Sequence, residues 1–169
     1  MTSALSQLKE MYAYMIWADN RIIEAATTVP DEGFRRDQNI SAGSVHKLLL
    51  HALGAQWLWL GRWQGDSTRK FPTPEELPTV GAIKGRWGEV HQMLLAFLNQ
   101  QTDESVEKRI EYIRNGQPHA NKLLHVMCHA ADHGTYHRGQ LNSMIKLAGG
   151  KPVDVGYVTY RRVQEGQQT

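Results

Sequence analysis

Residues 129–140 read His-Ala-Ala-Asp-His-Gly-Thr-Tyr-His-Arg-Gly-Gln, so that His133 and His137 stand four positions apart. On a helix, residues four apart lie one turn above each other on the same face. Their imidazole nitrogens can therefore meet at one point, which is half of a metal site. Imidazole is a ligand suited to zinc, nickel, iron and copper. A third ligand must come from another helix.

The helix that carries this segment is predicted to run from Pro118 or His119 to Ala148, ahead of two glycines. The face that holds its two histidines is otherwise small or apolar, with Val126, Ala130, Leu141 and Met144. A buried imidazole without a partner forfeits hydrogen bonds worth roughly 1–3 kcal/mol, so a shared metal ion explains the pair well. The alternative is that one histidine caps a backbone carbonyl and the other reaches the surface.

Helical spacing of apolar residues recurs in three further stretches. These are residues 6–28, a helix that follows an N-cap at Ser44 and ends near Trp63, and one that starts at Thr73 or Val80 and runs through Leu98. Four amphipathic helices predict an all-α fold, an antiparallel four-helix bundle whose sites are built from inward side chains. The connections 31–41 and 106–118 are long enough for a crossover, so the helix order stays open.

A small β-hairpin is predicted before the last helix. Within residues 106–113, alternate positions place Val106, Lys108, Ile110 and Tyr112 on one side of a strand, and the pair Asn115-Gly116 follows them. Asn-Gly is a strong signal for a two-residue hairpin turn.

Bulk composition narrows the class of protein. The chain has 169 residues, of which 41% are hydrophobic, and this size predicts a single domain over residues 1–169. The net charge of +2 is too small to favour a nucleic acid or a membrane as a partner. Cys128, the only cysteine, cannot form an internal disulfide, and the first residues do not resemble a secretory signal. We therefore expect a cytoplasmic protein.

His51 is the best candidate for the third ligand, because it shares an apolar helical stripe with Leu48, Ala55 and Leu58. The rival candidates are His46, His91, His125 and His129. His46 lies off that stripe near a helix start, where exposure is expected, and a lone histidine such as His91 is more often a hydrogen-bonded neighbour. His129 is interpreted as a residue beside the site that positions a substrate or a ligand.

Four residues near the histidines have structural interpretations. Arg138 and Gln140 are expected to anchor the bundle through hydrogen bonds. Gly139 costs about 1 kcal/mol in a helix and is expected to permit close packing by a neighbouring helix or chain. Cys128 lies outside the histidine stripe and is expected to be a small buried hydrophobe.

These motifs resemble those of the DinB/YfiT-like family of metalloproteins. The resemblance covers nearly the whole chain and rests on residues 129–140, on Val45–Ala52 with Trp57–Trp59, on Tyr14, Trp17, Asp19 and Asn20, and on residues 149–157. It implies a four-helix bundle with a nonsequential helix order, a divalent metal held by His51, His133 and His137, and homodimers. It implies no single reaction, because relatives include transferases and isomerases that use low-molecular-weight thiols, alongside members without an established activity.

Three neutral imidazoles would leave a divalent ion with an open coordination position, as in catalytic sites. Such an ion can lower the pKa of a bound water to about 7 or deprotonate a thiol. We therefore expect a metal-dependent enzyme, a thiol-cofactor-dependent transferase or a hydrolase, acting on a small-molecule substrate. The expected metal is zinc or nickel, with iron or manganese as alternatives, and a low-molecular-weight thiol is a candidate cofactor. The other hypothesis is a non-catalytic metal-binding bundle, a stress-response or interaction protein.

Overall fold

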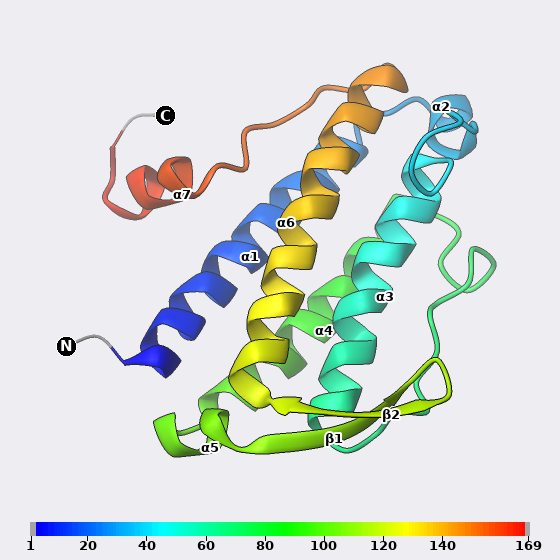
Figure 1. Ribbon diagram of the computed structural model, residues 1–169. Helices are drawn as coiled ribbons and strands as arrows, with labels where there is room; N and C mark the ends of the chain where they lie inside the picture. The colour runs from blue at the N-terminus through cyan, green and yellow to red at the C-terminus, as the bar shows by residue number, and fades with distance from the viewer. Residues whose placement is uncertain (1–2, 168–169) are drawn as a thin grey trace.

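Four long helices form the bundle in the computed structural model, which describes residues 3–167 (Figure 1). They are α1 (Ala4–Ala26), α3 (Val45–Trp63), α4 (Val80–Asn99) and α6 (Leu123–Leu147). The short helices are α2 (Asp31–Arg35), α5 (Asp103–Glu107) and α7 (Tyr157–Gln164). The predicted all-α four-helix bundle is confirmed. Within residues 3–167, no helix offers the long apolar stretch that spanning a bilayer requires.

The helix order around the bundle is nonsequential. The contacts between helices give the order α1, α4, α3, α6, and α6 closes the ring against α1. Figure 1 shows α1 and α6 running one way and α3 and α4 the other. The contacts between α3 and α6 agree with this antiparallel arrangement. The ring of His51 lies against that of His137, and the ring of Trp59, two turns later on α3, lies against that of His129, two turns earlier on α6. Helices α1 and α3 follow each other in the sequence of long helices but lie diagonally across the bundle from each other. This is the nonsequential helix order that the family resemblance implies.

Side-chain caps fix where three of these helices begin. Ser3, Ser44 and Thr79 each accept a hydrogen bond from the backbone N–H three residues on. Such a bond satisfies one of the free donors of a first helical turn. The Ser44 cap is the predicted one, and the cap at Thr79 places the start of α4 at Val80, the later of the two predicted starts.

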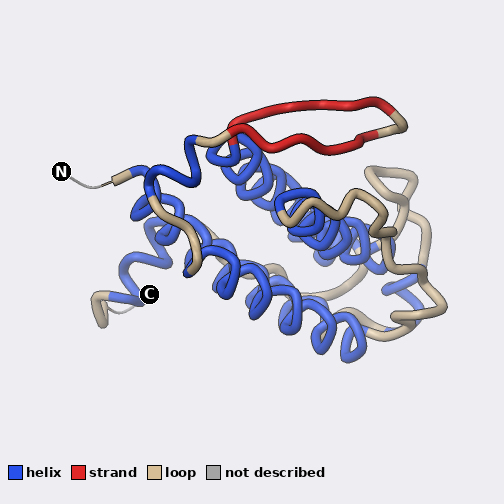
Figure 2. The backbone as a smooth tube through the Cα atoms, turned by 90° about the horizontal axis from the view of Figure 1, so that it is seen from below, coloured by secondary structure: helices blue, strands red, loops and turns tan. Residues whose placement is uncertain are grey.

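The predicted hairpin is present, with β1 (Arg109–Arg114) pairing antiparallel to β2 (Gln117–Lys122). Asn115 and Gly116 between them have φ values of 51° and 73°, and a two-residue hairpin turn of this kind needs positive φ at both positions. Figure 2 shows the hairpin beside the end of the bundle where α6 begins. Tyr112 of β1 packs there on Trp59 of α3, with ring centroids 5.4 Å apart.

Two predicted boundaries near the hairpin are wrong. The last long helix begins at Leu123 instead of Pro118 or His119, because residues 117–122 pair with β1. Proline is tolerated in this strand because a two-stranded sheet consists of edges only. The first strand begins at Arg109, since Val106 is buried in the short helix α5.

A polar network links all four long helices inside the bundle. The Asp19 carboxylate of α1 accepts hydrogen bonds from Arg138 Nη1 of α6, at 2.8 Å, and from Gln56 Nε2 of α3, at 2.7 Å. His91 of α4 lies 3.3 Å from the same carboxylate, and Trp87 Nε1 donates to Gln56 Oε1 at 3.0 Å. The Asp19 and Arg138 side chains are almost completely buried, so each charge is stabilised by the opposite charge of the other instead of by water.

The surroundings of Asp19 keep it ionised. Burial alone would raise the pKa of Asp19, but the hydrogen bond with His91 and the charge of Arg138 outweigh burial and lower this pKa. The folded-state pKa thus lies below the unfolded value of about 3.9. The network therefore contributes stability above about pH 4, and that contribution is lost as the pH falls through the folded-state pKa.

We predict that Asp19→Asn lowers the free energy of unfolding by about 3–5 kcal/mol, because it leaves the buried Arg138 guanidinium without a countercharge. Urea unfolding at pH 7 measures this change. Glu24→Gln is the matched control, because Glu24 also lies on α1 but pairs with Lys84 at the surface, where an ion pair contributes at most about 1 kcal/mol. Equal losses in the two variants would contradict the role given to Asp19.

Candidate metal centre

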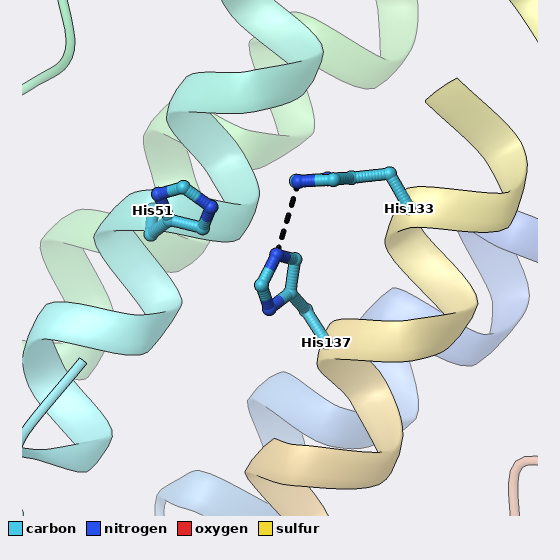
Figure 3. A group of neighbouring side chains, drawn as sticks. All are labelled: His51, His133 and His137. Carbon is cyan, nitrogen blue, oxygen red and sulfur yellow. Dashed lines mark hydrogen bonds between the residues drawn. The ribbon is translucent and has the colours of Figure 1, made fainter. Parts of the chain in front are cut away.

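Three histidines from two helices point toward one another between α3 and α6 (Figure 3). His51 comes from α3, and His133 and His137 come from successive turns of α6. Each offers one ring nitrogen, and the three nitrogens lie within 4.8 Å of one another. The Nε2 atoms of His133 and His137 are 3.0 Å apart. The structure thus brings together the three residues that the sequence singles out.

The spacing of these nitrogens fits a divalent ion. Two nitrogen ligands that each lie 2.0–2.1 Å from a tetrahedral zinc ion are about 3.3 Å from each other. The nitrogens of His133 and His137 are slightly nearer to each other than this distance. A small movement of the His51 side chain would bring its nitrogen to the same distance from them. Imidazole is also a ligand that zinc, nickel and iron accept. The donor set and its geometry are therefore compatible with metal binding.

Two of the three rings, those of His51 and His133, have a lowered pKa and so favour their neutral form. Burial, together with the neighbouring His137 and His51, lowers the pKa of His133 from 6.5 to about 4. Burial and His137 also lower the pKa of His51. A metal ion binds the neutral imidazole, so protons compete little for these two ligands at pH 7.

Gln140 determines which nitrogen His137 presents to the cluster. The Gln140 side-chain oxygen lies 2.7 Å from His137 Nδ1. An amide oxygen can only accept a hydrogen bond, so Nδ1 carries the proton and Nε2 keeps its lone pair. This Nε2 faces the other two histidines. Such bonds from outside the ligand set orient metal-binding histidines.

The cluster is accessible from the surface of the bundle. His51 and His133 are half-buried, whereas His137 is only 8% exposed. The exposed Phe71 ring stacks on His51, with centroids 5.5 Å apart, and the exposed Tyr136 ring meets His137 edge to face at 5.1 Å. Two aromatic side chains thus frame the cluster where solvent reaches it.

The rival histidines lie outside the cluster. His91 is a hydrogen-bonded neighbour, as predicted, and its partner is Asp19. His46 was expected at the surface but is 3% exposed, because the segment before α4 covers it and Leu77 O accepts a hydrogen bond from its Nε2 at 2.8 Å. His125 is exposed, and the exposed His129 ring lies 5.9 Å from that of His133. His129 therefore borders the cluster, as the sequence suggested.

The expectation for Cys128 is wrong, and that for Gly139 is contradicted in part. Cys128 is exposed, because it lies off the inward face of α6, in a groove between α1 and α6. No neighbouring helix packs on Gly139, where a Cβ would meet no atom of another element within 4 Å, and close packing by a second chain stays a prediction. Arg138 and Gln140 do form hydrogen bonds, but Gln140 bonds to a candidate ligand instead of to another helix. The three-residue spacing between His137 and Gln140 is the signal that could have predicted this bond.

The fold and the cluster define a helical-bundle protein with a candidate metal centre between two antiparallel helices. A sequence model of the DinB family matches residues 1–169. Protein DinB of Bacillus subtilis (strain 168) is 22% identical over 158 residues, which cover 87% of this chain and 90% of that protein. The chain belongs to the DinB family.

We predict that metal-free protein holds His137 in the tautomer with the proton on Nδ1, because Gln140 Oε1 accepts that proton's hydrogen bond. Gln140→Leu removes the acceptor and shifts the tautomer population toward the proton on Nε2. Long-range ¹H–¹⁵N NMR correlation distinguishes the two tautomers. Asn142→Leu is the control on the same helix, since Asn142 bonds to Val153 and does not touch the cluster. A dominant Nε2–H tautomer in the unsubstituted protein would contradict the assignment.

Proposed function

We propose that this protein binds one divalent metal ion through His51, His133 and His137. The observation that carries the proposal is the convergence of three imidazole nitrogens, from two helices, within 4.8 Å of one another. Two histidines on one helix could form a simple hydrogen-bonded pair. A third ring from the neighbouring helix α3, turned toward the same point, is better explained by a shared partner, because an imidazole nitrogen without a partner loses a hydrogen bond. Membership of the DinB family supports the same proposal.

The ligand set favours a reactive ion over a structural one. Structural zinc sites are closed by four protein ligands, whereas catalytic sites keep a position open. In the part of the chain that the structure describes, the cluster contains no fourth histidine, cysteine or acidic side chain. Two of its three rings are also only half-buried. A small molecule could therefore reach the ion.

We infer that the protein is a metal-dependent enzyme of the thiol-cofactor-dependent transferase or hydrolase type. When bound, the ion would supply Lewis acidity to a thiol or a water molecule. The protein itself would fix the geometry of the ligands. Gln140 holds the His137 ring by a hydrogen bond, and Asp19 holds Arg138, the residue that follows His137. His129, whose ring lies 5.9 Å from that of His133, could accept the released proton. Zinc or nickel fits the imidazole donors best, with iron or manganese as alternatives.

Untagged protein, purified without chelator, should contain about one divalent ion per chain. His51→Ala and His137→Ala should each lower the metal content at least tenfold, because each leaves only two ligands. Plasma mass spectrometry measures the content. His125→Ala is the matched control, since this exposed histidine lies on α6 but outside the cluster, and it should keep full occupancy. Full occupancy in both cluster variants would contradict the ligand assignment.

The cobalt-substituted protein should respond to a thiol at the open position. N-acetylcysteine should produce a new absorption band from sulfur-to-cobalt charge transfer, whereas N-acetylserine, which differs only in its hydroxyl, should not. Visible and near-ultraviolet titration measures this difference. An unchanged spectrum with N-acetylcysteine would indicate a sealed ion and favour a non-catalytic metal-binding bundle.

A further inference from the structure

A cavity of about 320 Å³ is lined by Phe71, whose ring also stacks on His51 of the histidine cluster. Its wall comes from α3, from the start of α4 and from residues 64–79, which we call the connecting segment. This segment runs back along α3 from its end to its beginning. The cavity has the volume of a small-molecule site.

The connecting segment is anchored at both ends, so the cavity is preformed. At one end, Arg69 Nη1 donates to Trp57 O at 3.3 Å and Nη2 donates to Gln64 Oε1 at 2.7 Å. At the other end, His46 Nε2 donates to Leu77 O at 2.8 Å. Between these anchors, Thr73 and Glu76 exchange hydrogen bonds and close a turn.

Gly54 positions Phe71 between the cavity and the cluster. A Cβ at residue 54 would overlap the Phe71 ring, so only glycine lets the ring lie directly on α3. Residue 54 stands between the face of α3 that carries His51 and the face that carries Leu53 and Trp57. Phe71 consequently stacks on His51, with an interplanar angle of 10°, and also lines the cavity. One exposed side chain therefore separates the two spaces.

The lining of the cavity is apolar with a positively charged edge. Leu53, Trp57, Phe71 and Leu77 provide the apolar surface. Lys70 and Arg86 provide two cations, and the guanidinium of Arg86 lies 4.6 Å from the centroid of the Trp57 ring. One Arg86 nitrogen pairs with Glu89 at 2.7 Å, which leaves the other donors of the guanidinium for a ligand.

Glu76 is the one carboxylate among the residues that line the cavity. Its Oε2 already accepts a hydrogen bond from the backbone N–H of Thr73 at 2.7 Å. The lining thus holds two cations and one acid, which is engaged in its own turn, and a second acid, Glu89, pairs with Arg86 from outside the lining. Such an edge favours an anion over a neutral or cationic molecule.

We propose that this cavity binds a small organic anion, namely an apolar body that carries a carboxylate. The body would lie on Phe71 and Leu77, because the guanidinium carbons of Arg69 and Arg86 already lie 3.7 Å and 4.6 Å from the centroid of the Trp57 ring. The carboxylate would accept hydrogen bonds from Arg86 and Lys70. This inference rests on the proposed function in one respect: the cavity would hold the substrate beside the metal centre, with Phe71 as the shared wall. Binding of the anion itself needs no metal.

The first experiment uses metal-free protein, with 4-phenylbutyrate as the probe and 4-phenyl-1-butanol as its uncharged counterpart. Calorimetric titration should give a dissociation constant at least tenfold lower for the carboxylate. Arg86→Gln and Lys70→Gln should each reduce this preference, whereas Lys146→Gln, an exposed lysine on α6, should leave it unchanged. Equal binding of the two probes would overturn the proposal.

A second variant tests the location. Leu77→Trp fills the cavity and should weaken 4-phenylbutyrate binding at least tenfold, with circular dichroism to establish that the helices persist. Should this variant unfold, Leu77→Phe adds less volume and should weaken binding in the same direction. Undiminished affinity in a folded Leu77 variant would overturn the location.

The third experiment tests proximity to the metal centre. The aromatic ¹H signals of 4-phenylbutyrate should broaden or shift with cobalt-loaded protein but not with zinc-loaded protein. If cobalt leaves the probe signals unchanged, the cavity does not hold a ligand beside the metal centre, and that part of the proposal fails. Failure of the protein to bind either metal would instead overturn the proposed function, and the metal-free titration would still decide whether the cavity binds the anion.

Discussion

Asp19 on α1 and Arg138 on α6 face each other inside the bundle at 2.8 Å, and both side chains are at most 2% exposed. Removing either charge would leave the other in a medium that solvates it poorly. The pair therefore constrains both the distance between α1 and α6 and the rotation of α6 about its axis. Gln56 and His91 bring α3 and α4 to the same carboxylate. Every long helix is thus held to one buried point.

The candidate metal centre depends on this rotation. Arg138 follows His137 in the sequence, so a helix that turns Arg138 toward α1 turns His137 and His133 toward α3. His51 meets them because α3 lies beside α6 and runs antiparallel to it. Gln140, one turn further along α6, then fixes the tautomer of His137. A polar network in the core and a histidine cluster near the surface are therefore two consequences of one helix orientation.

Patterns local in sequence predicted much of this structure. The spacing of His133 and His137 and the apolar stripe around His51 identified the three residues that the fold brings together. The Ser44 cap and the Asn115-Gly116 turn are local as well, and both occur as predicted. Whether the three histidines hold a metal stays a prediction.

Features that depend on contacts between distant segments were not predictable from the sequence. Nothing near Phe71 indicates that it stacks on His51, because that contact needs Gly54 and the whole connecting segment. The start of α6 depends on pairing between β1 and β2, which displaces the helical pattern at Pro118. The burial of His46 likewise results from a backbone carbonyl 31 residues away.

His51, His133 and His137 are proposed to share one ion. X-ray absorption at the metal edge, on protein purified from its own host, is the decisive measurement because it reports the ligand type and number of the native metal. A shared ion should show about three imidazole nitrogens, at about 2.0–2.1 Å if the metal is zinc, and should lose one of them in His51→Ala. A spectrum without imidazole scattering, or one that His51→Ala leaves unchanged, would contradict the shared ion.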